Sequence, residues 1–261
     1  SLTGVSRPLS TGCQSLDSLL GGGFERGTVT QVYGPPAAGK TNIMLSAALH
    51  TAATESMAVY VDTEGISSDR FRQIADGVVD ESSSADRESL TSQVIMSEAH
   101  DFEAQAAAVR DTAEFANRAD LIVLDSATGF YRLQRTLGGT LKNNVSTDGT
   151  ASENAESTEG ADGGDTLRRL TSQITHLLSL ARKHDLAVVI TNQVFTDPDT
   201  DRVRPLGGYT LEHWTGTVLK LERFRGGKRR ATLEKHQSKP TGGSATFMIT
   251  DTGVTDHESI S

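Results

Sequence analysis

Apolar and polar positions follow one repeating pattern between residues 28 and 192: a short apolar run, a turn, and then a longer stretch with helical spacing. The apolar runs are strand-length and continuous, which is typical of strands buried on both faces. They occupy residues 28–33, 57–62, 92–99, 120–126 and 186–192. Strands separated by helices predict βαβ units, and so an α/β fold with a mostly parallel twisted sheet flanked by helices.

Helical spacing is clearest in residues 39–53, in residues 101–119 and after residue 165. In the last of these, Asp165 is a plausible N-cap. One helical face there carries Leu167, Leu170, Ile174, Leu177, Leu178 and Ala181. Three β-type runs follow at residues 217–224, 229–236 and 245–250, separated by glycine-rich turns. This spacing predicts a C-terminal antiparallel extension of the sheet.

Residues 138–164 break the pattern, because they contain almost no apolar side chains. Such composition cannot bury enough apolar surface to order a segment, so we predict a disordered surface insertion. The remaining pattern fits one domain over residues 1–261 with this insertion in it.

Composition narrows the class of protein. No run of about 18 apolar residues is present, so we expect no membrane segment. The single cysteine, Cys13, excludes an internal disulfide framework, and we expect a reducing cytoplasm. The net charge is −9, and only seven of the 25 basic residues are lysine, a balance that suggests a high-salt cytoplasm. Overall negative charge argues against binding nucleic acid by net charge alone, but allows a local basic patch.

The run GPPAAGKT, residues 34–41, matches the phosphate-binding pattern G-x-x-x-x-G-K-[ST] between a predicted strand and a predicted helix. Backbone N–H groups of such a loop surround phosphate oxygens at a helix N-terminus. Lys40 would reach the β- and γ-phosphates, and the Thr41 hydroxyl would ligate Mg²⁺. The candidate nucleotide ligands are Gly34, Pro35, Pro36, Ala37, Ala38, Gly39, Lys40, Thr41 and Asn42.

Two carboxylates follow other predicted strands. Asp125 ends an apolar strand, where it could contact Mg²⁺ through water, although a strand-end aspartate can also be ordinary. Glu64 lies just past the end of the strand at residues 57–62, where it could orient an attacking water. A solvated loop glutamate is the alternative for Glu64.

The motifs TGCQSLDSLLGGGFERGTVTQVYGPPAAGKT, YVDTEG, LIVLDS and VVITNQV occur in this order. Together they resemble the ATPase core of the RecA/RadA recombinase family over most of the chain. The resemblance implies ATP and Mg²⁺ as cofactors and a catalytic role for Glu64 with Lys40. It implies a γ-phosphate sensor at Gln193 and an adenine-stacking side chain at Arg70. His213 matches a phosphate-sensing histidine, and a packed or solvated histidine is the alternative.

Within that family the chain is most similar to the short archaeal paralogues of the RadA recombinase. We expect no helix-hairpin-helix domain and no Phe-x-x-Ala linker ahead of the core. The loop after VVITNQV is short, residues 195–205. The resemblance implies an ATP-binding and DNA-binding accessory of recombination with weak ATPase activity and no robust strand exchange. Its implied partners are DNA, a RadA-type recombinase and a Holliday-junction resolvase.

The DNA candidates are cations concentrated at a predicted hairpin turn and in the short loop. They would act on phosphates of single-stranded or branched DNA without reading sequence, and a solvated hairpin tip is the alternative. These residues are Arg202, Arg204, Arg225, Lys228, Arg229 and Arg230, with Arg223 beside them. The segment around Arg132 and Arg135 occupies the family's first DNA loop, with no clear role.

Two lysines, Lys235 and Lys239, could reach the ATP of a neighbouring subunit or could be solvated. Two other classes of function stay open at this point. One is a signalling or clock-type RecA-like ATPase, and the other is a scaffold that binds ATP and presents a surface to the recombinase.

Overall fold

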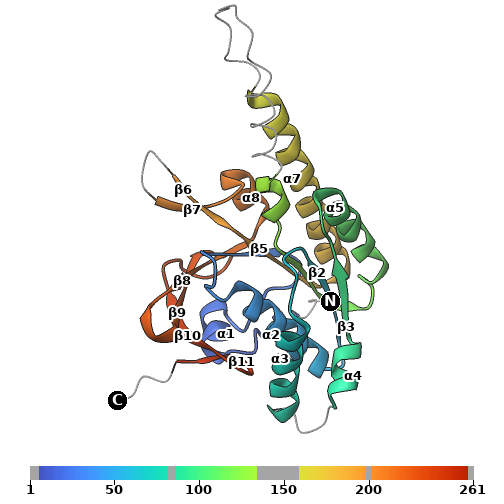
Figure 1. Cartoon of the computed structure of the whole chain (residues 1–261), viewed down its shortest axis with the longest axis vertical. Helices are drawn as coiled ribbons and strands as arrows, with labels where there is room; N and C mark the ends of the chain where they lie inside the picture. Colours follow the sequence, from blue (N-terminus) through green and yellow to red (C-terminus); the bar gives the residue numbers. More distant parts are fainter. Residues whose placement is uncertain (1–5, 82–85, 134–158, 198–201, 258–261) are drawn as a thin grey trace, which may run out of the picture.

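A nine-stranded sheet organises the computed structural model, which describes residues 6–81, 86–133, 159–197 and 202–257 (Figure 1). The order across the sheet is β11-β10-β9-β8-β1-β5-β4-β2-β3. Its strands are β1 (Val29–Tyr33), β2 (Met57–Asp62), β3 (Val94–Glu98), β4 (Ala119–Asp125), β5 (Ala187–Asn192), β8 (Thr217–Arg223), β9 (Lys228–Lys235), β10 (Ser244–Thr250) and β11 (Gly253–Asp256). A separate two-stranded sheet pairs β6 (Val194–Asp197) with β7 (Arg202–Pro205).

Strands β3, β2, β4, β5, β1 and β8 run parallel, and β8 to β11 continue the sheet antiparallel. The central strands β1 and β5 are buried at every residue, which explains why their sequences are apolar without alternation. The predicted α/β fold class and the C-terminal antiparallel extension are confirmed.

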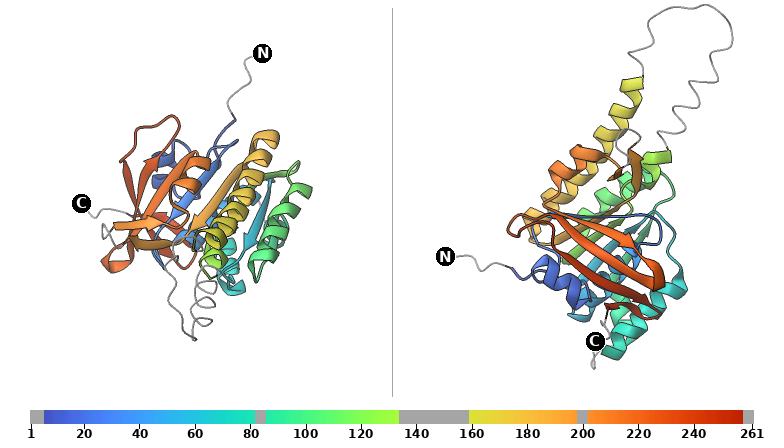
Figure 2. Two further views of the ribbon diagram at one scale, coloured as in Figure 1. Left: turned by 90° about the horizontal axis from the view of Figure 1, so that it is seen from above. Right: turned by 90° about the vertical axis from the view of Figure 1, so that its left-hand side faces the viewer.

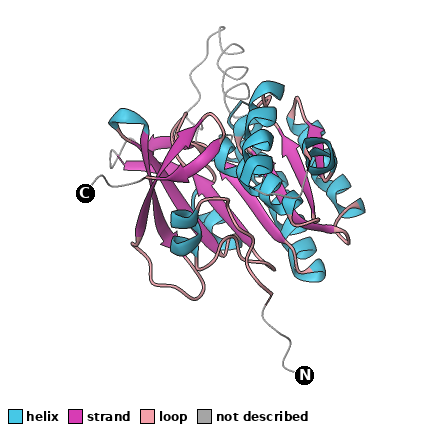
Figure 3. Cartoon of the chain, turned by 90° about the horizontal axis from the view of Figure 1, so that it is seen from below, coloured by secondary structure: helices cyan, strands magenta, loops and turns pink. Residues whose placement is uncertain are grey.

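Helices cover both faces of the parallel strands (Figures 2 and 3). One core holds apolar side chains of α1, α2, α3 and α4, and the other holds those of α5, α7 and α8. These helices are α1 (Gln14–Leu20), α2 (Lys40–Ala53), α3 (Ser68–Glu81), α4 (Arg87–Ser92), α5 (Phe102–Asp111), α7 (Glu159–His184) and α8 (Gly208–Trp214), with single 3₁₀ turns η1 (Thr112–Glu114) and η2 (Arg225–Gly227). Among the described residues, no helix is both long and apolar enough to cross a membrane.

Helix α7 begins at Glu159, so the predicted boundary of the insertion is wrong at its C-terminal end. Asp165 is therefore an exposed residue inside the helix and not its N-cap. The rest of the predicted insertion, residues 138–158, lies outside the described residues. The sequence pattern did not predict α1, α3, α4, α8, the β6–β7 hairpin or β11. In α3 the buried Ile74 and Val78 stand four residues apart, a helical signal that was present in the sequence.

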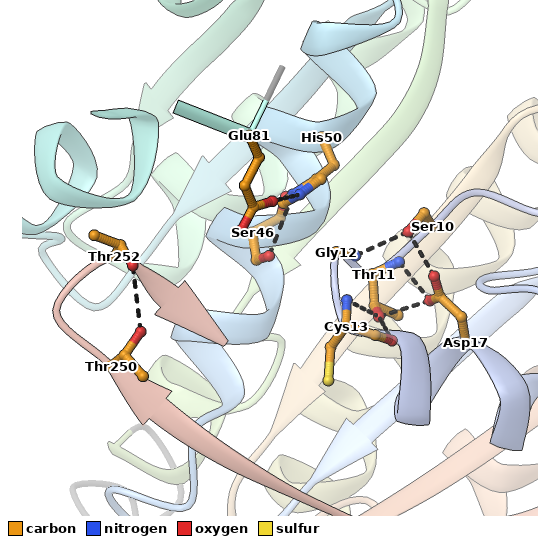
Figure 4. Close-up of polar contacts among 10 residues, drawn as sticks. All are labelled: Ser10, Thr11, Gly12, Cys13, Asp17, Ser46, His50, Glu81, Thr250 and Thr252. Atoms are coloured by element: carbon orange, nitrogen blue, oxygen red, sulfur yellow. Dashed lines mark hydrogen bonds and ion pairs between the residues drawn. The ribbon is translucent and has the colours of Figure 1, made fainter. Parts of the chain in front are cut away.

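The segment ahead of α1 is fixed by the carboxylate of Asp17 (Figure 4). This carboxylate accepts from the Thr11 N–H and hydroxyl, both at 2.7 Å, and from the Ser10 hydroxyl at 2.5 Å. Gly12 has φ +83°, and a Cβ there would lie 2.4 Å from the Ser46 Oγ and His50 Nδ1 of α2. Asp17 thus folds the chain back so that Cys13 and α1 pack into the core beside α2.

The antiparallel strands pack directly on the loop between β1 and α2. A Cβ added at Gly34 would lie 2.7 Å from the Leu221 carbonyl oxygen of β8. One added at Gly39, where φ is +105°, would lie 2.9 Å from Ile249 Cδ1 and 3.3 Å from Phe247 Cε2 of β10. Gly34 therefore requires glycine for the close approach of the β8 backbone, whereas Gly39 also requires it for its left-handed backbone.

Phe247→Ala should lower the free energy of unfolding by about 3–5 kcal/mol, because Phe247 is fully buried between β10 and the loop. Phe224→Ala is the matched control, since Phe224 is 41% exposed and should cost less than about 1 kcal/mol. Urea unfolding of both variants tests this. Equal losses would contradict the packing of the antiparallel strands on the loop.

Candidate functional site

A cavity of about 340 Å³ lies at the carboxyl ends of the central parallel strands. Ligand sites in open α/β sheets form at this edge, because the loops after neighbouring strands meet there. Residues from four separate stretches line the cavity: Gly34, Pro36, Ala37, Gly39, Lys40, Thr41, Asn42, Glu64, Asp125, Ser126, Arg132, Gln193 and Val194. The predicted site residues Lys40, Glu64, Asp125 and Gln193 thus meet in one cavity. Pro35 and Ala38 belong to the same loop, but they are not among the lining residues.

The glycine-rich loop joins β1 to α2 as the sequence predicts, and Gly39 is the N-cap of α2 in the left-handed region. The Lys40 ammonium donates to the carbonyl oxygens of Gly34 at 2.7 Å and Pro35 at 3.0 Å. Burial lowers the pKa of Lys40, while the charges of Asp125 and Glu64 act in the opposite direction. A cation held in this way inside the loop is placed to exchange the two carbonyls for phosphate oxygens.

Asp125 is the polar centre of the site, and it is 1% exposed. Its carboxylate accepts from the hydroxyls of Thr41 at 2.7 Å, Tyr60 at 2.7 Å and Thr191 at 2.6 Å. These donors come from α2, β2 and β5, so one carboxylate ties three elements together. Burial raises the pKa of Asp125 and outweighs the three donors, which would lower it. The Tyr60 pKa is also raised, first by burial and then by Asp125.

Glu64 is held over the cavity by the turn that follows β2. The Asp62 carboxylate accepts from the backbone N–H groups of Glu64, Gly65 and Ile66 at 2.7–3.0 Å, which fixes this turn. The Glu64 Oε1 then accepts from the Ser126 hydroxyl at 2.7 Å and from Gln193 Nε2 at 3.4 Å. Both donors bind the same oxygen, so within the described ranges Oε2 stays available to accept from water.

Gln193 connects the cavity to the β6–β7 hairpin. Its backbone N–H donates to the Thr128 hydroxyl at 3.2 Å, and its carbonyl accepts from the Leu206 N–H at 3.0 Å. Beside it, the buried Asn192 donates to the Leu206 carbonyl at 2.7 Å. The two ends of the hairpin are therefore held together beside the cavity by the bonds of Leu206 to Gln193 and Asn192.

The oxygen donors fit a magnesium ion that arrives with phosphates. Mg²⁺ prefers oxygen ligands, keeps several waters and takes few protein ligands. Thr41 and Asp125 supply such oxygens next to the loop. Over the described ranges of the chain, no group of three or more His, Cys, Asp or Glu side chains could hold a metal by itself.

Arg70 lies next to Asn42 and makes contacts that its sequence assignment did not foresee. Its guanidinium donates to the Asn42 Oδ1 at 2.8 Å and to the carbonyls of Thr250 at 2.8 Å and Asp251 at 2.7 Å. Burial lowers the pKa of Arg70, and Asp251 opposes this. Arg70 thus braces the β10–β11 turn against α2, and its adenine-stacking role stays a prediction.

His213, Lys235 and Lys239 lie outside the cavity. His213 is exposed and packs edge-on against Trp214, with ring centroids 5.1 Å apart. Lys235 donates to the Glu212 carbonyl at 2.7 Å, close to the C-terminus of α8. Lys239 donates to the Ser18 carbonyl at 3.1 Å in the last turn of α1. Both ammonium groups lie at helix C-termini, where positive charge is favourable. These contacts explain the positions of the two lysines without a neighbouring subunit.

The predicted DNA residues of β9 and of the η2 turn before it do not form one patch. Arg225 is exposed and Lys228 is half-buried at the turn. Arg230 forms an ion pair with Glu222 at 2.9 Å and lies 4.9 Å from the Phe224 ring centroid. Arg229 instead donates to the Ala37 carbonyl of the glycine-rich loop.

The remaining cations are distributed over other elements. Arg202 and Arg204 lie on β7. Arg132, which the sequence placed in a DNA loop, lines the cavity, and Ser126 is a further site residue that the sequence analysis missed. Ser126 follows Asp125 directly, so its place at the carboxyl end of a predicted strand could have indicated that it belongs to the site. Arg135 lies outside the described residues.

A strand–loop–helix phosphate site, a buried aspartate at the end of β4 and a glutamate at the cavity define a RecA-like P-loop domain. Comparisons agree: the sequence profile of the Rad51 family matches residues 6–147 and 159–257. "DNA repair and recombination protein RadB" of Halobacterium salinarum is 61% identical over 94% of both chains. Its namesake in Methanococcoides burtonii is 38% identical over 96% of this chain and 98% of its own.

A solved structure described as "Crystal structure of the RadB recombinase" superposes with a TM-score of 0.71 at 34% identity. It covers 96% of this chain and 100% of its own. The chain therefore belongs to the Rad51 family and, within it, to the RadB proteins of archaea.

Asp125→Asn should stabilise the protein at neutral pH. The raised pKa of Asp125 means that its stabilising contribution is complete below the unfolded-state pKa of about 3.9 and is lost as pH rises through the folded-state value. Asparagine does not titrate, so the variant should gain about 1 kcal/mol over wild type at pH 7 and little near pH 4. Urea unfolding from pH 4 to 8 without Mg²⁺ measures the difference.

Asp62→Asn provides the matched control. Asp62 accepts three backbone N–H groups, and an amide cannot replace both of its oxygens, so this variant should lose about 1–3 kcal/mol. If Asp125→Asn were as destabilising as Asp62→Asn at pH 7, burial would not dominate at Asp125.

Proposed function

We propose that the chain is an ATP-binding and DNA-binding accessory protein of homologous recombination and DNA repair. It acts in the cytoplasm as a mediator of the RadA-type recombinase, with weak ATPase activity and no robust strand exchange. A Holliday-junction resolvase is a further partner in this proposal. The observation that carries it is the meeting of Lys40, the Thr41–Asp125 pair and Glu64 with Gln193 in one cavity. The RadB relatives contribute the context of repair and recombination through their names.

ATP would bind with its phosphates against the N-terminus of α2. Lys40 would leave the Gly34 and Pro35 carbonyls for the β- and γ-phosphates. Thr41 and Asp125 would hold Mg²⁺, which neutralises phosphate charge when it is bound. The adenine would lie toward Arg70, beyond Asn42.

Hydrolysis would depend on the free oxygen of Glu64. With Oε1 held by Ser126 and Gln193, Oε2 can accept from a water aimed at the γ-phosphate. Loss of the γ-phosphate would alter the Glu64–Gln193 contact at the base of the β6–β7 hairpin. Phosphoryl transfer of this type depends on positioning and charge neutralisation, so the same residues that bind ATP control its turnover.

DNA binding would use backbone phosphates alone, through Arg225 and Lys228 at the β8–β9 turn and through Arg202 and Arg204 on β7. This positive charge is small against a net charge of −9. High salt would weaken it further, because binding through phosphates falls with ionic strength. A protein with such a weak electrostatic contribution would reach DNA mainly alongside a partner, which fits a mediator better than a filament.

Glu64→Gln should strongly reduce turnover while ATP affinity stays within about twofold of wild type. Glutamine keeps the shape and the contacts of Oε1 but cannot act as a base, so turnover should fall by about 10²–10⁴-fold. Single-turnover hydrolysis and calorimetric titration with Mg·ATP measure the two effects separately.

Lys40→Ala is the control for binding. Removing the ammonium should weaken ATP affinity at least about tenfold, or 1.4 kcal/mol. Undiminished turnover in Glu64→Gln, or undiminished affinity in Lys40→Ala, would contradict these roles.

The double variant Arg225→Gln/Lys228→Gln should weaken binding to single-stranded DNA about equally for every sequence. It should also reduce the slope of log affinity against log salt by about 0.7 for each phosphate that the variant no longer neutralises. Arg230→Gln is the matched control. Arg230 is already paired with Glu222, so this variant should change the slope less. Fluorescence anisotropy in a salt series measures the slopes. If the wild-type protein binds no DNA even at low salt, the result would favour a scaffold that acts through protein partners.

A further inference from the structure

Strand register divides the basic residues of the β8–β9 hairpin between two faces. Arg223 pairs with Arg229, and Arg229 pairs with Phe247 of β10, so these three side chains lie in one row on one face. Phe247 is fully buried and lies against Gly39 of the glycine-rich loop. The neighbouring row, Glu222 and Arg230, lies on the opposite face. Arg229 is therefore on the face that contacts the nucleotide loop.

Arg229 contacts that loop directly. Its Nη2 donates to the Ala37 carbonyl at 3.2 Å, and its Nη1 donates to the Gly227 carbonyl of the hairpin turn. One guanidinium thus bridges the loop and the tip of the hairpin. Its Nε is buried without a hydrogen-bond partner in the described structure. Arg223, directly across from it, carries a like charge, which opposes this placement and has to be offset by the contacts that Arg229 makes.

Ala37 is the loop residue that most needs such a contact. Its φ is +60°, in the left-handed region that a non-glycine residue adopts at a cost. Such a conformation persists only where the surroundings hold it. Ala37 also lines the cavity, so its backbone is part of the wall that phosphates would meet. The Arg229 bond to its carbonyl is one of the contacts that can hold this wall in place.

We propose that Arg229 is a positioning residue that ties the phosphate-binding loop to the basic hairpin, so that nucleotide binding and nucleic-acid binding strengthen one another. This inference rests on the proposed function, because it names how the two binding sites of that function are connected. Bound phosphates fix the loop, and a fixed Ala37 carbonyl keeps Arg229 and the Gly227 turn in one position. The neighbouring Arg225 and Lys228 then meet DNA already ordered, which reduces the entropy lost on binding. Linkage requires the reverse effect to be equally large.

The coupling factor is the ratio of single-stranded DNA dissociation constants measured without and with Mg²⁺ and the non-hydrolysable ATP analogue AMP-PNP. Wild type should give a factor of at least about five. Arg229→Gln should reduce the factor to about one. Arg225→Gln, a matched loss of charge on the same turn, should weaken DNA binding in both states and keep the wild-type factor.

A second measurement needs no DNA. Arg229→Gln should weaken AMP-PNP binding about threefold in the wild-type background but less than about 1.5-fold in an Ala37→Gly background. Glycine adopts the left-handed conformation freely, so the loop no longer depends on Arg229. A residue that only stabilised the hairpin would show the same loss in both backgrounds. Thermal unfolding confirms that each variant is folded.

The results separate this inference from the proposed function. If wild type binds both ligands with a coupling factor within twofold of one, or if Arg229→Gln keeps the wild-type factor, the role of Arg229 is overturned and the proposed function stands. Equal losses of AMP-PNP affinity in the two backgrounds would also overturn it. If wild type binds no AMP-PNP, the proposed function fails, and this inference fails with it.

Discussion

The buried carboxylate of Asp125 is the interaction on which the site depends. Three hydroxyls, from the helix after the phosphate loop and from the strands on both sides of β4, donate to one side chain that is almost fully excluded from water. The strong directional bonds to this group fix the distance between Thr41 and the end of β4. A fixed spacing of this kind would suit a magnesium-bound polyphosphate, because Mg²⁺ demands nearly ideal geometry. Burying the carboxylate works against stability, as the direction of its pKa shift shows, so the arrangement serves a ligand better than it serves the fold.

The second constraint is the close packing of the antiparallel strands on the phosphate loop. A side chain at Gly34 would meet the Leu221 backbone carbonyl, and one at Gly39 would press on the Phe247 and Ile249 side chains. The C-terminal extension therefore packs against the outside of the candidate nucleotide-binding loop. This packing also brings Arg229 to Ala37, so the hairpin cannot move far without disturbing the loop. On the other side, Gln193 and Asn192 give the β6–β7 hairpin a comparable attachment.

Much of the fold and the centre of the site could be predicted because their signals are local in the sequence. The continuous apolar runs at β1, β4 and β5 and the pattern at residues 34–41 carry their meaning without knowledge of distant contacts. The predictions that failed concern features that the local sequence pattern does not determine. Glycine and acidic residues in 159–164 argue against a helix, yet α7 continues through them. The hairpin cations look equivalent in sequence, but register turns Arg229 toward the loop and pairs Arg230 with Glu222. No local pattern could show Arg132 at the cavity either.

The cavity at the carboxyl ends of β1, β2, β4 and β5 would act as one nucleotide site in contact with the β8–β9 hairpin. Hydrogen–deuterium exchange of the wild-type protein, with and without Mg²⁺ and AMP-PNP, tests this most directly. Bound nucleotide should slow exchange in residues 34–41, in the turn at 62–66 and in the hairpin at 224–230. It should cause no change in the separate cavity between α5 and α7, around Gln173 and His176. Unchanged exchange in residues 34–41, or protection confined to the α5–α7 cavity, would contradict the assignment of this nucleotide site.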